Sequence, residues 1–187
     1  MVDVPMPEDS DLPSDVVAKL HSLPPISIYR LLAIVPRSVT PWADLVDAIY
    51  NCELPDRLRE IGICRQARTA RADYELFQHR QIARNTGVTQ DELDTIHREP
   101  VVTSLDDAAN LVCQVADELE TAATLSDGTQ NALYATLGRQ QATELILTLS
   151  FYAAVARFTN ATRAPIEADN PLATAANPNE SRTDSLA

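Results

Sequence analysis

Lysine and glycine are both scarce in this sequence of 187 residues. Lys19 is the only lysine, so nearly all of the 15 basic residues are arginines, and the 27 acidic residues leave a formal net charge of −12. A surface with this excess of negative charge repels nucleic acid and anionic lipid. We therefore expect neither nucleic acid nor a membrane among the partners.

Cysteine pairs are also missing. The three cysteines, Cys52, Cys64 and Cys113, are widely spaced and odd in number, and no CxxC motif occurs. This spacing argues against a disulfide framework and against a zinc ribbon. Free thiols in a reducing compartment are the simplest interpretation.

No segment of the chain has the pattern of an export signal or a membrane span. The first residues, MVDVPMPEDSDLPSD, are acidic and contain neither a basic region nor an apolar core. The longest apolar run, from Leu145 to Phe158, is interrupted by Thr148, Ser150 and Arg157 and is too short to cross a bilayer. We therefore expect a cytoplasmic protein.

Regular alternation of apolar and polar residues, which is typical of strands, is absent over any long stretch, and the middle of the chain is rich in good helix formers. The sequence therefore predicts an all-α protein with about eight helices. We expect a flexible acidic tail over residues 1–13, one helical domain over residues 14–166, and a disordered tail over residues 167–187, where Asn, Pro, Ala, Ser and Asp dominate.

Three ionisable residues in the stretch 59–87 interrupt otherwise apolar helix faces. On a helix over residues 72–86, His79 lies in the middle of the apolar face and Glu75 lies one turn earlier, at its edge. On a preceding helix that starts near Pro55, Glu60 also shares a face with apolar residues. A buried carboxylate is costly unless it is paired, hydrogen-bonded or protonated. These three residues are therefore candidates for a functional site.

The boundary between these two helices is not marked by a glycine or a proline. Thr69 or Asp73 is a candidate cap for the second helix. One long bent helix is the alternative.

Two carboxylates and an imidazole are suited to proton transfer, because burial raises the pKa of a Glu and a neighbouring His can share its proton. A purely structural reading is that Glu75 and His79 form an ordinary polar contact at i,i+4. A metal site for zinc or iron is a third reading, but the spacing of Glu60, Glu75 and His79 matches no E-x-x-H di-iron pattern, so we expect no metal and no other cofactor.

Three segments resemble the carboxymuconolactone decarboxylase family, within the alkylhydroperoxidase-D-like superfamily. They cover roughly residues 26–163 and read IYRLLAIVPRSVTPWADLV, LPDRLREIGICRQARTARADYELFQHRQIARNTGVTQDELDTI and LSDGTQNALYATLGRQQATELILTLSFYAAVARFTNA. The resemblance implies an alkylhydroperoxidase-D-like multi-helix bundle that assembles into trimers or hexamers. It also implies decarboxylation or isomerisation, without a cofactor, of a small lactone-like acid.

The peroxidase members of this superfamily carry a Glu, then a CxxC motif, then a His. The family Glu aligns with Glu60 and the family His with His79, whereas Ala72 and Glu75 occupy the two cysteine positions. A thiol peroxidase, which needs a low-pKa thiol and a resolving thiol, is therefore the disfavoured alternative. A non-catalytic helical oligomer that binds a small molecule or a protein is another.

The resemblance gives His79 the proton-transfer role, with Glu75 and Glu60 as its orienting partners. Arginines are the usual ligands of a substrate carboxylate, and Arg59, Arg71 and Arg157 are candidates. Of these we expect Arg157 to bind an anionic small-molecule substrate. Tyr74 is added as a second substrate contact, although it lies off the His79 face on an ideal helix.

Overall fold

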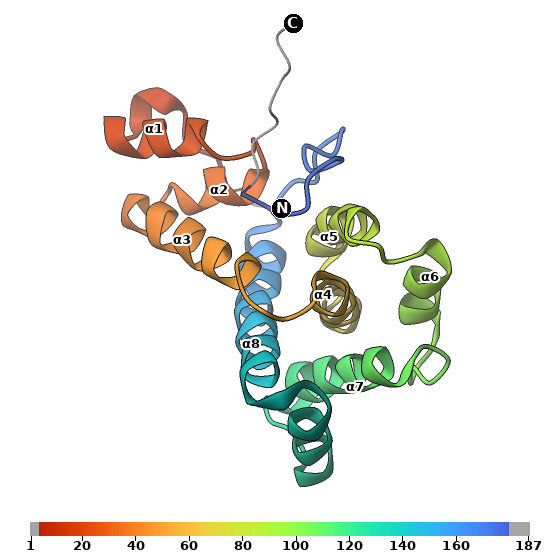
Figure 1. Cartoon of the computed structure of the whole chain (residues 1–187). Helices are drawn as coiled ribbons and strands as arrows, with labels where there is room; N and C mark the ends of the chain where they lie inside the picture. Colours follow the sequence, from red (N-terminus) through yellow and green to blue (C-terminus); the bar gives the residue numbers. More distant parts are fainter. Residues whose placement is uncertain (1–3, 180–187) are drawn as a thin grey trace, which may run out of the picture.

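The computed structural model describes residues 4–179, and within them the chain forms eight α-helices, two short 3-10 helices and no strand (Figure 1). The all-α prediction is confirmed. The helices are α1 (Ser14–His21), α2 (Ser27–Leu32), α3 (Val39–Tyr50), α4 (Asp56–Ala70), α5 (Asp73–Asn85), α6 (Gln90–Arg98), α7 (Asp107–Ala122) and α8 (Asp127–Thr162).

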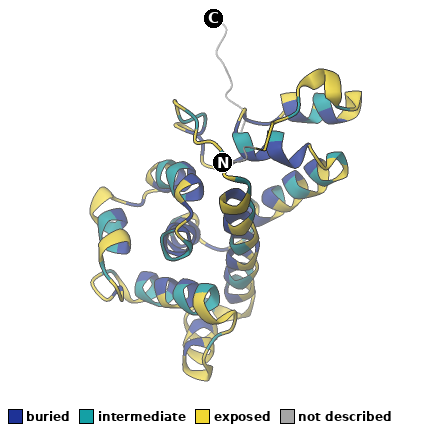
Figure 2. Ribbon diagram, turned by 180° about the vertical axis from the view of Figure 1, so that it is seen from behind, coloured by how far each residue is buried: buried dark blue, intermediate teal, exposed yellow. Residues whose placement is uncertain are grey.

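Helix α4 is the centre of the larger layer. It packs against α5, α6, α7 and α8, which surround it in Figure 1. Every residue from Leu58 to Ala67 is buried, and this is why the helix is dark along its length in Figure 2. Gly62 allows the close approach of α7 and α8, because a Cβ at this position would lie 3.1 Å from a Val112 methyl carbon and 3.3 Å from one of Leu145.

The helices α1, α2 and α3 form a second group on the other side of α8 (Figure 1). Their apolar residues share one hydrophobic cluster with Tyr74 and Ile82 of α5 and with Phe151 and Tyr152 of α8. A separate cluster joins α4, α6, α7 and the first half of α8. The residues singled out by the sequence therefore lie where these two parts of the core meet.

Local residue types account for several helix ends. Thr89 and Glu92 form a capping box at the start of α6, and Gly87 adopts a positive φ of 93° just after α5. Gly138 interrupts α8 with non-helical backbone angles, so that element consists of two helices joined at a kink.

The C-terminal segment, residues 167–179, differs from the expected disordered tail. Leu172 is 1% exposed and belongs to the hydrophobic cluster of α1–α3, while the side chain of Asn85 donates hydrogen bonds to the carbonyls of Ala173 and Ala175, the latter at 2.7 Å. The buried Leu172 and Ala175 side chains and two backbone acceptors thus hold a segment that composition alone marks as polar. Residues 180–187 of the expected tail lie outside the described residues, and the domain boundaries stay a prediction.

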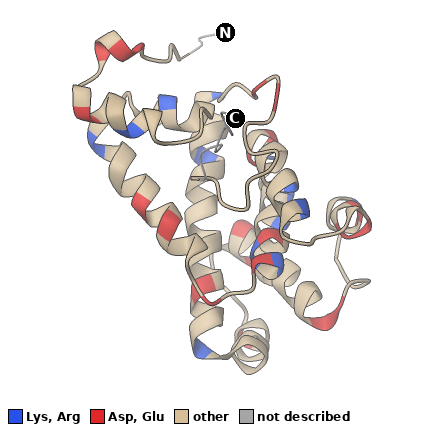
Figure 3. Cartoon of the chain, turned by 45° about the horizontal axis from the view of Figure 1, so that its top comes forward, with Lys and Arg blue, Asp and Glu red and all other residues tan. Residues whose placement is uncertain are grey.

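Acidic residues are spread over many helices (Figure 3). Among residues 4–179, no helix is long and apolar enough to cross a membrane.

Candidate functional site

The turn between α4 and α5 positions the site. Arg71 ends α4 in the left-handed conformation, with φ 54°, and the backbone N–H of Ala72 then donates to the carbonyl of Ala67. This turn lets α5 pack against α4, so that residues far apart in the sequence face one another. The structure therefore answers the question that the sequence leaves open, in favour of two helices with a break at Arg71.

His79 of α5 is paired with Glu60 of α4. Its Nδ1 lies 2.9 Å from Oε2 of Glu60, and both side chains are buried. A carboxylate only accepts hydrogen bonds, so this contact places a hydrogen on Nδ1. In the neutral imidazole, Nε2 then carries the lone pair.

The other oxygen of Glu60 has partners as well. Its Oε1 accepts a hydrogen bond from the Tyr50 hydroxyl at 2.8 Å and one from Nε of Arg59 at 3.3 Å. Arg59 is itself buried, stacks over the Tyr50 ring at 4.0 Å and pairs with Asp56 at 2.8 Å. A charged Glu60 is therefore compensated on both oxygens, as a buried carboxylate requires.

Glu75 is in the opposite situation. Its side chain is 1% exposed, and neither carboxyl oxygen has a hydrogen-bond partner among the described residues. Burial raises the pKa of the Glu75 carboxyl well above its usual value, and the negative charges of Glu120 and Glu60 add to the effect. Glu75 therefore keeps its proton to higher pH than an ordinary glutamate.

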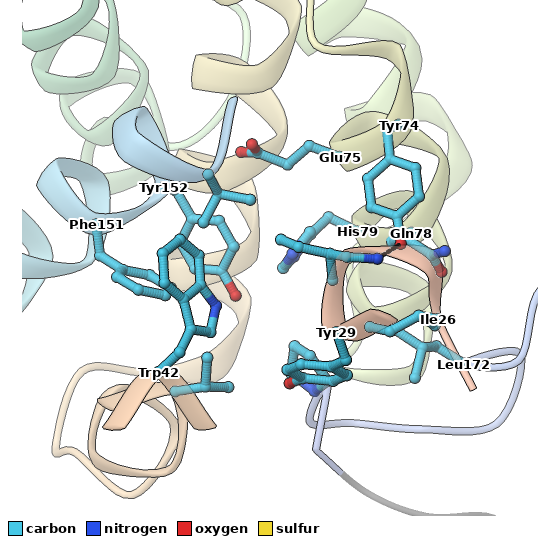
Figure 4. Close-up of a pocket in the computed structure, with 14 residues that line it drawn as sticks. Ile26, Tyr29, Trp42, Tyr74, Glu75, Gln78, His79, Phe151, Tyr152 and Leu172 are labelled. Carbon is cyan, nitrogen blue, oxygen red and sulfur yellow. Dashed lines mark hydrogen bonds between the residues drawn. The ribbon is translucent and has the colours of Figure 1, made fainter. Parts of the chain in front are cut away.

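Glu75 and His79 share one cavity of about 40 Å³. Figure 4 shows both side chains extending from α5 toward Tyr152 of α8. A volume of this size holds a few water molecules, and substrate pockets are usually several times larger. The cavity is lined by Ile26, Ile28, Tyr29, Trp42, Val46, Tyr74, Glu75, Gln78, His79, Phe151, Tyr152, Val155, Leu172 and Pro178.

Aromatic side chains form much of the wall. The edge of the Tyr152 ring meets the His79 ring with centroids 4.6 Å apart, and Trp42 packs against Phe151 at 4.9 Å. The Tyr152 hydroxyl donates to that of Tyr50 at 3.4 Å, which extends the Glu60 network to the cavity. Sequence reasoning did not assign Tyr152 or Trp42 to the site, although the FY pair of α8 lies in a segment that carries the family resemblance.

The two expected substrate contacts lie in different surroundings. Tyr74 lines the cavity and is 5% exposed, although an ideal helix turns it away, because α2 and the C-terminal segment close over that face of α5. Arg157 does not line the cavity: its side chain is 62% exposed and lies 3.5 Å from Glu120. Arg157 therefore lies outside this cavity, and neither Arg59 nor Arg71 lines it.

The thiols are poorly suited to chemistry at this site. Cys64 is buried, and burial together with the charges of Glu60 and Glu75 raises its pKa well above the usual value. Residues 4–179 contain no group of three His, Cys, Asp or Glu side chains arranged to hold a metal ion.

The family model described as the carboxymuconolactone decarboxylase family matches residues 36–118, which include α3 to α6 and most of α7. This confirms the resemblance over residues 36–118, whereas the third resembling segment, residues 125–161, lies outside the match. Glu60, Glu75 and His79 all lie inside the matched region, whereas Tyr152 and the C-terminal segment lie outside it. No curated protein and no solved structure matches the chain.

Proposed function

Since residues 36–118 of this chain match the model of the carboxymuconolactone decarboxylase family, we propose that the protein is an acid–base enzyme of the lyase or isomerase type. Its substrate is a small lactone-like or carboxylated metabolite. One observation carries the proposal: a histidine with an available ring nitrogen and a buried glutamic acid without a partner line the same cavity. An orphaned buried carboxyl is costly, and a ligand with a hydrogen-bonding oxygen would compensate for it.

His79 is the base in this scheme. Its Nδ1–H is directed to Glu60, which fixes the tautomer and stabilises the imidazolium that forms when Nε2 takes a proton. Nε2 forms no hydrogen bond with any residue from 4 to 179. Glu60 therefore acts as a positioning residue that also supplies charge.

Glu75 is the acid. With its pKa raised by burial, the carboxyl holds a proton that it donates to a substrate oxygen on which negative charge develops. The separation of roles follows a known pattern, in which neighbouring groups with different environments take opposite tasks in proton transfer. Here Glu60 is paired on both oxygens and Glu75 on neither.

For an isomerisation, Nε2 of His79 removes a proton from the carbon next to a lactone carbonyl while Glu75 protonates the carbonyl oxygen, which gives an enol. His79 then returns its proton to a different carbon, and Glu75 takes its proton back from the enol oxygen. The double bond has moved, and both residues are restored. For a decarboxylation, the electron pair released with CO₂ passes to the same carbonyl, whose oxygen takes a proton from Glu75. His79, protonated at Nε2 by solvent, then delivers to the carbon the proton that replaces the carboxylate, and Glu75 regains its proton from the enol. Both reactions use the same two side chains.

The test uses a β,γ-unsaturated five-membered lactone, α-angelica lactone, whose conjugated isomer absorbs in the ultraviolet. We expect the wild-type protein to catalyse the shift in D₂O with incorporation of deuterium into the lactone. His79→Gln should abolish it and Glu75→Gln should lower the rate by roughly 100-fold or more. Asp169→Ala, a change at an exposed residue of the C-terminal segment, serves as the control.

Equal rates for the wild type and for His79→Gln would refute the proposal. Lactone binding without turnover would instead favour a non-catalytic binding protein.

We also propose a homo-oligomer. In the apolar run of α8, Leu145 and Leu149 are buried inside the subunit, but Leu147 between them is 51% exposed. Burial of such residues between subunits is a common source of association energy. Light scattering that gives the mass of a single chain would contradict this.

A further inference from the structure

The C-terminal segment places a carboxylate at the edge of the cavity. The Glu167 carboxylate accepts three hydrogen bonds: from the backbone N–H of Ser27 at 2.5 Å, from the Tyr74 hydroxyl at 3.2 Å and from Nε2 of Gln78 at 2.6 Å. All three donors are uncharged. Hydrogen bonds to an ionised acceptor are about twice as strong as those between neutral groups. These donors therefore form a carboxylate-binding site that needs no arginine.

This carboxylate site is continuous with the cavity that contains His79 and Glu75. Tyr74 and Gln78 both line that cavity. The second polar atom of Gln78, its Oε1, is buried and has no hydrogen-bond partner among the described residues, and the whole side chain is 3% exposed. An unpartnered amide oxygen next to an anion site points to a ligand that carries a hydrogen-bond donor as well as a carboxylate.

The same segment closes the cavity. Leu172 and Pro178 form part of its wall, and Asn170 fixes the segment to α5 by donating to the carbonyl of Phe77 at 3.2 Å. The cavity is partly open to the surface, and its volume of about 40 Å³ holds water molecules but no five-membered lactone. Entry of such a ligand therefore requires displacement of the segment, and displacement removes Glu167 from the three donors.

We propose that the Ser27 N–H, the Tyr74 hydroxyl and the Gln78 amide bind the carboxylate of the substrate, and that Glu167 occupies this site in the closed state as an intramolecular competitor. The proposal deepens the proposed function by assigning the substrate-carboxylate site, which the arginines do not provide. A substrate whose carboxylate binds there has its lactone ring directed into the cavity, where Glu75 and His79 lie. Tyr74 remains a donor because burial and the Glu167 charge both raise its pKa.

The strength of the competition follows from tethering. A group held on the same chain by a short segment competes at an effective concentration in the millimolar range. A free carboxylate must overcome this before it binds. Removal of the Glu167 carboxylate should therefore increase the affinity for a small monocarboxylate by about tenfold or more.

Benzoate and benzamide are suitable probes, because they have nearly the same shape and differ in charge. Calorimetry and ligand-detected NMR on the full chain should show at least about tenfold tighter benzoate binding by Glu167→Ala than by the wild type, with benzamide binding much less affected. Glu167→Gln keeps the size of the side chain and serves the same test should the alanine variant not fold. Asp169→Ala removes another carboxylate of the same segment, one without a hydrogen bond or ion pair among residues 4–179, and should bind both probes like the wild type.

Adding Tyr74→Phe or Gln78→Leu to Glu167→Ala should reverse the gain for benzoate, because each removes one donor. The proposal is overturned when a folded Glu167 variant binds benzoate no better than the wild type does. It is equally overturned when benzoate and benzamide gain the same factor, since that outcome means only that the cavity has opened. Both readouts measure binding and not turnover. They therefore still decide this proposal if the lactone assay refutes the proposed acid–base activity.

Discussion

The imidazole of His79 pairs with Glu60, 19 positions earlier on another helix, at 2.9 Å, and not with Glu75, which lies one turn away on the same helix. This pairing separates the two acids. Glu60 is a satisfied hydrogen-bond acceptor that fixes the histidine tautomer, and Glu75 remains an isolated acid beside the cavity. The site therefore contains a positioned base and an acid rather than a simple i,i+4 polar contact.

The first prediction concerns Glu60→Gln. Tyr50 and Arg59 both donate to the Oε1 position, so the amide oxygen should occupy that position and the amide nitrogen should face Nδ1 of His79. The imidazole hydrogen would then move to Nε2, where it blocks the base. We expect kcat in the lactone assay to fall by roughly 10²-fold or more with little change in KM, and the free energy of unfolding to fall by about 1–3 kcal/mol.

Nitrogen NMR of the histidine ring distinguishes this tautomer switch from a general loss of structure. Tyr50→Phe is the matched control, because it removes one hydrogen-bond donor from Glu60 and leaves the carboxylate in place. We expect the control to keep the wild-type tautomer. A wild-type tautomer in Glu60→Gln itself would contradict the assignment.

The second prediction concerns Glu75 and pH. The pKa of its carboxyl is raised from 4.5 in the folded protein, so above pH 4.5 the folded state binds more protons than the unfolded state. The contribution of the protonated Glu75 carboxyl to the free energy of unfolding is therefore fully present below pH 4.5. It is lost as pH rises toward the folded-state pKa, with a slope of at most about 1.4 kcal/mol per pH unit.

Glu75→Gln removes this dependence. Urea unfolding between pH 5 and pH 8 should show a stability difference between the variant and the wild type that grows with pH in favour of the variant. Glu53→Gln, at an exposed position, should give a curve parallel to that of the wild type. A parallel curve for Glu75→Gln would show that the carboxyl ionises normally.

The sequence predicts the helical class, because this depends on local residue types. It also places Glu60, Glu75 and His79 inside the molecule. Their pairing could not be predicted, because the partner of His79 depends on how α5 packs on α4. An ideal helix turns Tyr74 away from the His79 face for a similar reason: helical periodicity describes one helix and not the elements that cover it. The buried contacts of Leu172 have no local signal at all within a polar, proline-containing segment.

The third prediction concerns the thiols. Burial raises the pKa of Cys64 well above its usual value and that of Cys113 to about 12, whereas Cys52 is half-buried. Iodoacetamide reacts with thiolates, so at pH 8 the native protein should gain a single adduct, at Cys52, while the unfolded protein gains adducts at all three cysteines. Cys52→Ser should remain unlabelled in the native state. Rapid native labelling of Cys64, measured by peptide mass spectrometry, would reopen the thiol peroxidase alternative.

The fourth prediction concerns the break between α4 and α5. Arg71 adopts φ 54° and ψ 44°, a left-handed conformation that costs most residues about 1–2 kcal/mol and that glycine adopts freely. The gain from glycine is partly offset because glycine also has more freedom in the unfolded chain. We therefore expect Arg71→Gly to raise the free energy of unfolding by about 0.5–1 kcal/mol in urea titrations. Arg71→Ala removes the same side chain but keeps the backbone strain, so it should leave the stability near that of the wild type. An equal increase in the free energy of unfolding for both variants would contradict this. It would mean that the arginine side chain, and not the left-handed backbone of the turn, destabilises the wild type.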